Sequence, residues 1–329
     1  MIVYGGRVDV LSDLLVRARA GNTRVRQLIR RPPWSVTYAD PPPLTVVATL
    51  GGCASARFDD AGAAAVRLAP GDIALIKGPG RHTIADDPST PPGFVIYQGR
   101  KHFPDGGEVA AQAQRHSAPR TYGDSLPGAT IMLRGAYELH GDAGARLLDM
   151  LPPLALVPAG PRTQPALDLL ATEIARDEPG QDAVLARLLD LVLVLALRAW
   201  CAGPQVVLPA WYRALEDPAI GDALRLMHDD PAHRWTVAAL ATEVGMSRAA
   251  FAARFTTLTG QPPLTYLTGW RMTLGADLLR DTEATIATVA RTVGYEDAFA
   301  FSVAFKRARG VSPSVWRRKC ADTRATTGG

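Results

Sequence analysis

The chain has 329 residues, 47% of them hydrophobic and 21% charged, and it carries a formal net charge of +4 with a pI near 9.1. This composition is that of an ordinary globular protein with room for two domains. The weak positive charge excludes a general polyanion binder, so any nucleic-acid site must be local.

The sequence also lacks the marks of secretion and membrane insertion. Residues 1–9 have no basic-then-apolar pattern, and the longest apolar run, Leu191–Leu197, is too short to span a bilayer. Cys53, Cys201 and Cys320 show neither CxxC spacing nor an even count, which argues against a disulfide framework and a structural zinc site. We therefore expect a cytoplasmic protein with no membrane partner.

The N-terminal half begins with a helix and continues as short strands. Residues 8–18, with Leu11 and Leu14 on one side, predict an amphipathic helix that lies across the outside of the segment that follows. Residues 104–124 are rich in Ala, Gly, Gln and charge and predict a loop. Short apolar runs separated by Pro and Gly clusters predict a β-sandwich or barrel, with strands at 34–38, 44–50, 73–76, 93–97, 129–133 and 137–139.

Two short motifs on either side of one predicted strand resemble part of a cupin barrel. Pro70-Gly71-Asp72 precedes the strand, and Gly78-Pro79-Gly80-Arg81-His82 follows it. Cupin enzymes hold a catalytic metal with two or three histidines and a glutamate on neighbouring strands. Here only His82 is in place, and residues 51–57 offer no imidazole or carboxylate at the expected spacing. We therefore expect a barrel with no metal and no cofactor.

A barrel without a metal still has an interior that can hold one small ligand. We expect this interior to be lined by side chains on the predicted strands or at their ends, namely Trp34, Tyr38, Cys53, His82, Phe94 and Tyr97. Each of these could instead simply fill the core. An exposed, activated Cys53 thiol could also sense oxidants, whereas a buried one would be inert.

Two helices and a linker follow the barrel. Residues 163–176 and 181–200 are predicted to be helices, broken by a Pro/Gly stop at residues 178–180. The second helix is apolar around its whole axis over Leu191–Leu197, so it must be buried inside its own domain or between subunits. Residues 202–209 have no helical period and predict an interdomain linker.

A pattern near the C-terminus is written twice, at residues 236–247 and 285–297. Each copy has a Thr cap, apolar residues at helical spacing, a Gly turn, a second cap and two Phe four residues apart, which predicts a helix-turn-helix. The caps are Thr236, Ser247, Thr285 and Asp297, the turns are Gly245 and Gly294, and the inward pairs are Phe251/Phe255 and Phe301/Phe305. Between the copies, residues 263–280 predict a rod of roughly 27 Å, which suits recognition helices held near the ~34 Å between successive major-groove faces.

These residues resemble the AraC/XylS family of bacterial transcriptional regulators. The resemblance rests on Ser247–Phe251, Trp270–Met272, Val293–Glu296 and Gly310–Pro313, within a stretch of about a hundred residues. It implies sequence-specific binding to double-stranded DNA, a homodimer joined through helices beside a cupin domain, and control by a small-molecule effector or a redox signal. It favours activation over repression, and an activator would also contact RNA polymerase.

The resemblance and the patterns together give an expected α+β architecture in three consecutive parts. A cupin-like ligand-sensing barrel takes residues 1–155, a helical dimerisation segment and linker 156–209, and an all-α double helix-turn-helix DNA-binding domain 210–329. A helix from 217 or 218 to 227 should precede the repeat. A short helix at 313–319 should follow it, before a disordered tail.

The outward side chains of the two recognition helices are the expected DNA contacts. They are Arg248, Ala249, Ala252, Ala253, Arg254 and Thr256 on the first helix, and Ala298, Phe299, Ser302, Val303, Lys306 and Arg307 on the second. In the resembling family the positions matching Ala253 and Val303 often carry arginine, which can bind guanine with two hydrogen bonds. Small apolar side chains can instead pack on thymine methyl groups, while basic residues on both helices and in residues 309–319 can reach phosphates.

Two alternatives stay open from the sequence. One is a cupin-type metal enzyme fused to a binding module, against which the incomplete ligand set argues. The other is a protein-interaction module with weakened DNA binding, because the outward faces are poor in hydrogen-bond donors. We favour a regulator that is not an enzyme, in which an effector shifts the population of domain arrangements.

Overall fold

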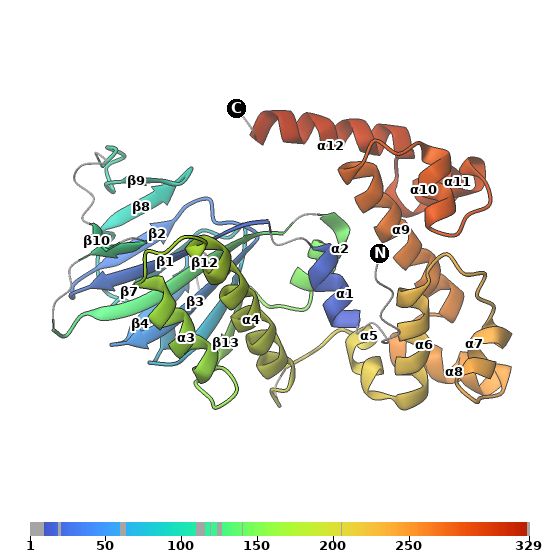
Figure 1. Ribbon diagram of the computed structural model, residues 1–329, viewed down its shortest axis with the longest axis horizontal. Coiled ribbons are helices and arrows are strands. Elements are labelled where there is room, and N and C mark those ends of the chain that lie inside the picture. The colour runs from blue at the N-terminus through green and yellow to red at the C-terminus, as the bar shows by residue number, and fades with distance from the viewer. Residues whose placement is uncertain are drawn as a thin grey trace. The chain divides into compact units, whose positions relative to one another are not determined.

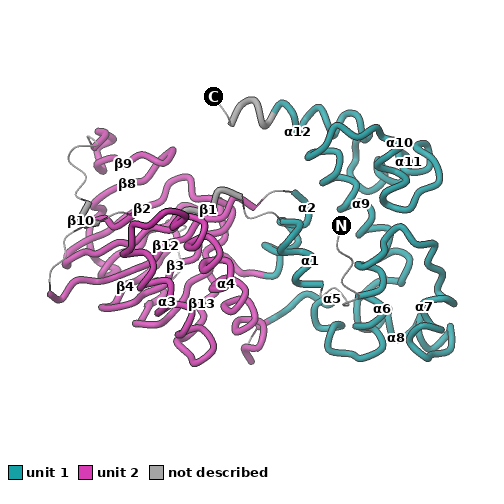
Figure 2. Tube along the Cα trace, viewed as in Figure 1, with its two compact units in different colours: residues 1–19, 140–150, 207–329 teal, residues 20–139, 151–206 magenta. Residues whose placement is uncertain are grey.

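The chain folds into two compact units (Figure 2). One, the β-unit, takes residues 20–139 and 151–206, and the other, the helical unit, takes residues 1–19, 140–150 and 207–329. The computed structural model describes residues 10–18, 21–59, 64–109, 116–118, 120–123, 127–139, 141–204 and 206–327. The predicted α+β class is confirmed, but the units differ from three consecutive segments because each takes pieces from both halves of the chain.

The β-unit contains two sheets (Figure 1). Sheet A has, in spatial order, β10 (His116–Ala118), β11 (Thr121–Gly123), β1 (Gly21–Arg30), β12 (Thr130–Glu138), β3 (Leu44–Gly51), β6 (Ile73–Lys77) and β13 (Leu154–Val157). Sheet B has β5 (Val66–Leu68), β4 (Ala54–Phe58), β7 (His82–Ala85), β2 (Ser35–Tyr38), β8 (Phe94–Tyr97) and β9 (Arg100–His102). One core joins them, in which Val36 and Ile84 of sheet B pack with Val47 and Met132 of sheet A.

Most predicted strands are present, and the differences come from long-range pairing. The runs at 34–38, 44–50, 73–76 and 93–97 correspond to β2, β3, β6 and β8. The two strands predicted at 129–133 and 137–139 are one strand, β12, because the ladders with β1 and β3 run through Gly135 without a break. The loop predicted at 104–124 is wrong for β10 and β11, because β11 gains a parallel partner in β1, far away in sequence.

Two helices of the β-unit pack against sheet A, namely α3 (Gln164–Ile174) and α4 (Gln181–Cys201). A Cβ atom on Gly135 would lie 2.1 Å from Leu189 Cδ2, so the glycine allows α4 to approach β12 closely. Glycine at this position is therefore a packing requirement.

The buried face of α4 packs against sheet A and α3 of its own unit. Leu189 and Leu193 are each 2% exposed, whereas Leu191 is 45% exposed and Val184 43%. Within one chain, one face of α4 meets sheet A and α3, and burial of its other faces between subunits stays a prediction. Leu191 and Val184 are the exposed large apolar residues of α4 and are available for a subunit contact.

The helical unit is built around two helix-turn-helix motifs joined by one long helix (Figure 1). Its elements are α1 (Val10–Arg17), α2 (Gly141–Leu148), α5 (Ala210–Arg213), the 3₁₀ helix η2 (Ala214–Glu216), α6 (Pro218–Asp229), α7 (Val237–Glu243), α8 (Arg248–Thr259), α9 (Pro263–Asp281), α10 (Ile286–Thr292), α11 (Ala298–Arg309) and α12 (Pro313–Thr327). The disordered tail predicted after residue 319 is wrong up to Thr327, because residues 314–327 contain no Gly or Pro to end α12. Among the described residues, no helix is long and apolar enough to cross a membrane.

Helix α1 packs in the helical unit, not across the barrel as expected. Val10 joins the core around Phe251 and Phe255, and Leu14 joins the core around Phe301 and Phe305. The amphipathic pattern predicted the helix correctly, but an apolar stripe does not say which surface it covers. Helix α1 thus contacts the cores of both motifs.

Candidate nucleic-acid interface and ligand cavity

Side-chain caps fix the first helix-turn-helix. Ala239 N–H donates to Thr236 Oγ1 (3.0 Å) at the start of α7, and Ala250 N–H donates to Ser247 Oγ (3.3 Å) at the start of α8. Gly245 between them has φ +68°, a left-handed conformation that glycine adopts without strain. The predicted caps and turn are confirmed.

The second motif repeats this geometry. Thr288 N–H donates to Thr285 Oγ1 (3.1 Å), and Ala300 N–H donates to Asp297 Oδ1 (2.7 Å). Gly294 has φ +84° at the turn. The second cap is again as predicted, with an aspartate whose negative charge also suits the positive end of the α11 dipole.

Arg271, near the middle of α9, connects the two motifs. Its Nε donates to Pro231 O (2.7 Å) and its Nη2 donates to His233 O (2.8 Å), both in the loop before α7. Its guanidinium also lies 5.9 Å from the ring centroid of Tyr295, which follows the second turn. The orientation of one motif relative to the other is therefore held by more than the backbone of α9.

A buried polar cluster attaches α1 to this pair of motifs. His228 Nδ1 lies 3.1 Å from Asp13 Oδ2 of α1, and His228 Nε2 lies 2.9 Å from the Tyr266 hydroxyl. The imidazole also stacks on Trp270 of α9, with 4.1 Å between ring centroids. Burial lowers the pKa of His228, although Asp13 acts in the opposite direction. A neutral imidazole then donates from Nδ1 to Asp13 and accepts the Tyr266 proton at Nε2.

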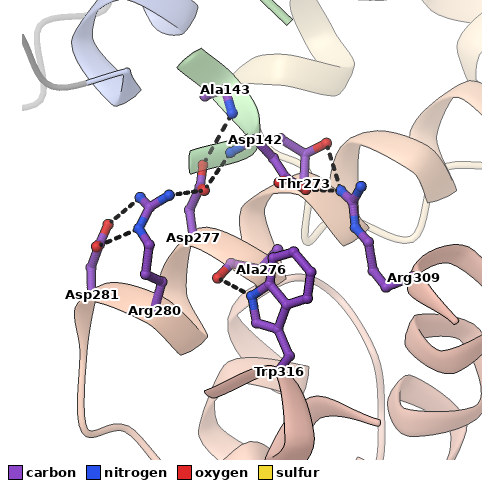
Figure 3. A network of polar contacts seen from close by, with 9 residues as sticks. All are labelled: Asp142, Ala143, Thr273, Ala276, Asp277, Arg280, Asp281, Arg309 and Trp316. Carbon is purple, nitrogen blue, oxygen red and sulfur yellow. Dashed lines mark hydrogen bonds and ion pairs between the residues drawn. The ribbon is translucent and has the colours of Figure 1, made fainter. Parts of the chain in front are cut away.

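A second cluster attaches α2 (Figure 3). Asp277 of α9 caps α2 by accepting hydrogen bonds from Asp142 N (3.0 Å) and Ala143 N (3.4 Å). The Asp142 carboxylate pairs with Arg309 in the last turn of α11, and Arg280 Nη1 lies 3.1 Å from Asp277 Oδ1. Burial raises the pKa of both carboxyl groups, and the neighbouring guanidiniums act against it. Helix α2 is thus bonded to the helix between the motifs and to the second recognition helix.

The residues proposed for DNA contact lie mainly on exposed faces. On α8 the exposed ones are Arg248, Ala249, Ala253, Arg254 and Thr256, and Ala252 is half-buried. On α11 Phe299 is 80% exposed and Val303 55%. Lys306 and Arg307 are also exposed, while Ala298 and Ser302 are half-buried. The four core Phe side chains are fully buried, so each helix presents its opposite side to solvent.

Intramolecular partners already hold some of the basic side chains. Arg254 pairs with Asp217, the N-cap of α6, and Arg309 pairs with Asp142. Arg317 Nη2 donates to Ala284 O (2.5 Å). Arg248 and the Lys306–Arg307 pair are the exposed cations on the two recognition helices that remain as first candidates for phosphate contact.

The six candidates for ligand contact are not gathered at one cavity. Trp34 is buried in the core, Tyr97 is 47% exposed, and the ring of Phe94 lies under the Lys101 ammonium (3.6 Å). Cys53 is half-buried, and its Sγ accepts a hydrogen bond from Arg67 Nη2 (3.4 Å). His82 is 1% exposed and stacks on Tyr38, with 5.2 Å between centroids.

Only Tyr38 of these six lines the cavity found in the β-unit. This cavity has a volume of about 330 Å³, and its walls come from the Pro41–Pro43 turn, Ile96 and one face of β12. The face of β12 presents Arg134, Ala136 and Glu138. Among the described residues, no group of three or more His, Cys, Asp or Glu side chains is placed to hold a metal ion.

Sequence reasoning missed Arg134, and one signal could have found it. Arg134 stands in the middle of a mostly apolar strand, at an alternate position whose neighbours Leu133 and Gly135 face the other side. A basic side chain on the inner face of a sandwich needs a partner or a ligand. The contacts of α1 and α2 had no comparable signal.

The chain matches two known domain families. Residues 9–202 match the family described as Cupin, and residues 240–319 match the family described as Helix-turn-helix domain. The predicted N-terminal cupin domain and C-terminal helix-turn-helix region are confirmed by these matches.

Relatives with regulatory names align over most of the chain. A protein of Streptomyces antibioticus described as an AraC-like transcription regulator is 33% identical over 315 residues, 94% of this chain and 99% of that protein. A protein of Streptomyces lividans with the same description is 33% identical and covers 94% of this chain and 98% of its own. The regulator AlkR of Acinetobacter baylyi is 33% identical over 199 residues, 58% of this chain and 64% of its own.

Similar solved structures include the DNA-binding domain of AdpA in complex with a target DNA. It is 28% identical over 33% of this chain and 97% of that chain, with a TM-score of 0.32. The near full-length relatives establish the family. The chain belongs to the AraC/XylS family of DNA-binding transcriptional regulators and carries an N-terminal cupin domain.

Proposed function

We propose that this regulator is controlled by a small molecule bound in the cavity of the β-unit. The proposal rests on strand β12, which connects the cavity to helix α2. β12 lines the cavity and ends at Glu138, and the chain then enters α2 at Gly141. Because α2 is bonded to α9 and α11, a ligand that shifts β12 can bias the arrangement of the recognition helices.

The proposed DNA contacts are the exposed faces of α8 and α11. Arg248, Lys306 and Arg307 would neutralise phosphates, and the apolar Phe299 and Val303 would pack on base edges. We assign phosphate contacts to the basic residues and base contacts to the apolar ones because of their chemistry and their exposed positions on the two helices.

A homodimer would place two such units on DNA, and we propose the exposed Leu191 and Val184 of α4 as its contact. A Leu191→Glu variant that sediments like the wild-type protein would contradict this interface. A protein that binds chromosomal DNA has to be in the same compartment as that DNA, so we propose a cytoplasmic location. The regulatory names of the relatives support a protein that is not an enzyme.

The test has two steps. The purified full chain is mixed with sheared genomic DNA, the bound fragments are sequenced, and the enriched promoter is then transcribed in vitro with RNA polymerase. An activator raises the transcript level, whereas a fall would assign repression. If no fragment is enriched by a folded protein, the interaction-module alternative replaces this proposal.

A redox signal at Cys53 is the second candidate, and one contact favours it. The Arg67 guanidinium donates a hydrogen bond to Sγ, which places a cation beside the half-buried sulfur that an oxidant would attack. Peroxide treatment that changes DNA affinity in the wild-type protein but not in Cys53→Ser would support it. Equal responses of the two proteins would exclude it.

A further inference from the structure

Arg134 lines the cavity of the β-unit and has no acidic partner among the residues that the structure describes. Its Nη2 donates a long hydrogen bond to Thr45 Oγ1 (3.5 Å), and its buried Nε has no hydrogen-bond partner among the described residues. None of the carboxylates in the described part of the chain forms an ion pair with it. A guanidinium remains charged at every physiological pH, and a partly buried charge without a counter-charge lowers stability.

The side chains around Arg134 do not supply that counter-charge. Its guanidinium lies 4.3 Å from the ring centroid of Tyr38, whose other neighbour is His82. Asp40 at the cavity is exposed, and its carboxylate accepts the Gln98 N–H (2.7 Å). The cavity therefore offers one positive anchor near an aromatic ring, with two acids, Asp40 and Glu138, at its exposed side.

Apart from these three charged residues the wall is mostly apolar, and the cavity is close in size to known small-molecule sites. Pro41–Pro43, Ile96 and Ala136 surround a volume of about 330 Å³, and pockets for small ligands start at roughly 300 Å³. Asp40 and Glu138 at the same cavity would repel a ligand with several negative charges. A ligand with one negative charge and an apolar body would match this cavity, which has one cation and mostly apolar walls.

We propose that this cavity binds a small organic monocarboxylate, with its carboxylate on the Arg134 guanidinium and its apolar body between the proline turn and Ile96. A planar guanidinium can donate two parallel hydrogen bonds to a carboxylate, which fixes the orientation of the ligand. This assignment rests on the proposed function, in which the β-unit senses a small molecule. It adds the ligand class and the residue that selects it.

Helix α4 packs against the other face of the same strand. Arg134 and Ala136 face the cavity, whereas Gly135 between them is in close contact with Leu189 of α4 on the other face. A ligand bonded to Arg134 therefore acts on a strand already fixed on its opposite side. The C-terminal end of β12 pairs with β1 and β3 and then leads to α2, so a displacement of the strand would be passed on to that helix.

The experiment measures binding of defined carboxylates to the full chain by calorimetry and thermal melting. The probes are benzoate, hexanoate and decanoate, each compared with its uncharged primary amide. We expect at least one carboxylate to bind tenfold or more tightly than its amide. Arg134→Gln should lose this preference, and Arg134→Lys, which keeps the charge without the fork, should retain part of it.

Arg100→Gln is the matched control, because Arg100 lies on the same unit, is 68% exposed and pairs with Glu108 at 3.2 Å. This variant should bind the probes like the wild-type protein. The proposal is overturned if no carboxylate raises the melting temperature of the wild-type protein at about 10 mM, or if Arg134→Gln binds as tightly as the wild-type protein. Should Arg134→Gln not fold, the comparison with Arg134→Lys decides.

DNA binding, measured on the same preparations without a probe, separates this inference from the proposed function. A protein that binds carboxylates through Arg134 but shows no effect of them on DNA affinity would keep the site and refute the control mechanism. A protein that binds no carboxylate but whose DNA affinity responds to another class of molecule would keep the control mechanism and refute the carboxylate site.

Discussion

His228 Nδ1 lies 3.1 Å from Asp13 Oδ2, so residues 215 positions apart share one buried hydrogen bond. Through it the N-terminal helix α1 becomes part of the helical unit. The contact also places α1 against both helix-turn-helix cores, through Val10 and Leu14. We infer that α1 stabilises one orientation of the two motifs.

Removing the acid from this pair should weaken the helical unit. Asp13→Ala leaves the buried His228 Nδ1–H without its acceptor, which costs about 1–3 kcal/mol in the free energy of unfolding. Urea denaturation measures this loss. Val16→Ala on the same helix, where Val16 is 75% exposed, is the control and should change little. Equal stability of the two variants would show that the buried pair does not hold α1.

Salt titration should separate the free cations from those held by acids. Arg248→Ala and Arg307→Ala should each weaken binding to specific and nonspecific DNA and reduce the slope of log K against log salt by about 0.9. Arg254→Ala should change the slope less, because Asp217 already pairs with Arg254. If Arg254→Ala had the largest effect, the assignment of phosphate contacts would have to be reversed.

The apolar face of α11 should set base preference. Val303→Arg adds a guanine reader at a position that is 55% exposed, and we expect it to shift preference between good and bad bases by about 1–3 kcal/mol with little change in salt slope. Phe299→Ala should lower affinity most at sites rich in thymine. Binding to a randomised operator library, with uracil replacing thymine as the control for the methyl group, measures both. Identical sequence preferences in all three proteins would place α11 away from the bases.

The β-unit should become less stable in mild acid because of His82. Burial lowers the pKa of His82 from 6.5 to about 4, so the unfolded chain binds a proton at a higher pH than the folded one. The stabilising contribution is present above pH 6.5 and is lost as the pH falls toward 4, by on the order of 3 kcal/mol. His82→Phe, placed between Tyr38 and Phe58, removes this proton. Its unfolding free energy should therefore fall less than that of the wild-type protein between pH 7 and pH 4, and parallel curves would contradict the assignment.

The helix-turn-helix motifs could be predicted from the sequence because their signals are local. Each depends on a cap, a glycine and a Phe pair within about twenty-five residues of one another. Gly245 and Gly294 show left-handed φ values as the pattern predicts. The strands β3 and β6 could be predicted for a similar reason, since both faces are covered and the runs are almost entirely apolar.

Helix α2 could not be predicted, because what stabilises it lies elsewhere in the chain. Its eight residues include Gly141 and Gly144, which favour no helix by themselves. The hydrogen bonds that begin it come from Asp277, more than a hundred residues later. The cavity wall at Arg134 could not be predicted for the same reason, because β12 reaches it through ladders with β1 and β3, far away in the sequence.

The central claim is that both motifs of one chain bind adjacent turns of DNA, held by α9, α1 and α2. Hydroxyl-radical footprinting of the full chain on its enriched operator tests it most directly. Two protected tracts per chain, one helical turn or about 10 base pairs apart, are the predicted result, and Asp13→Ala should weaken the protection of one tract relative to the other. A single tract in the wild-type protein, or two tracts that respond equally to Asp13→Ala, would contradict the account.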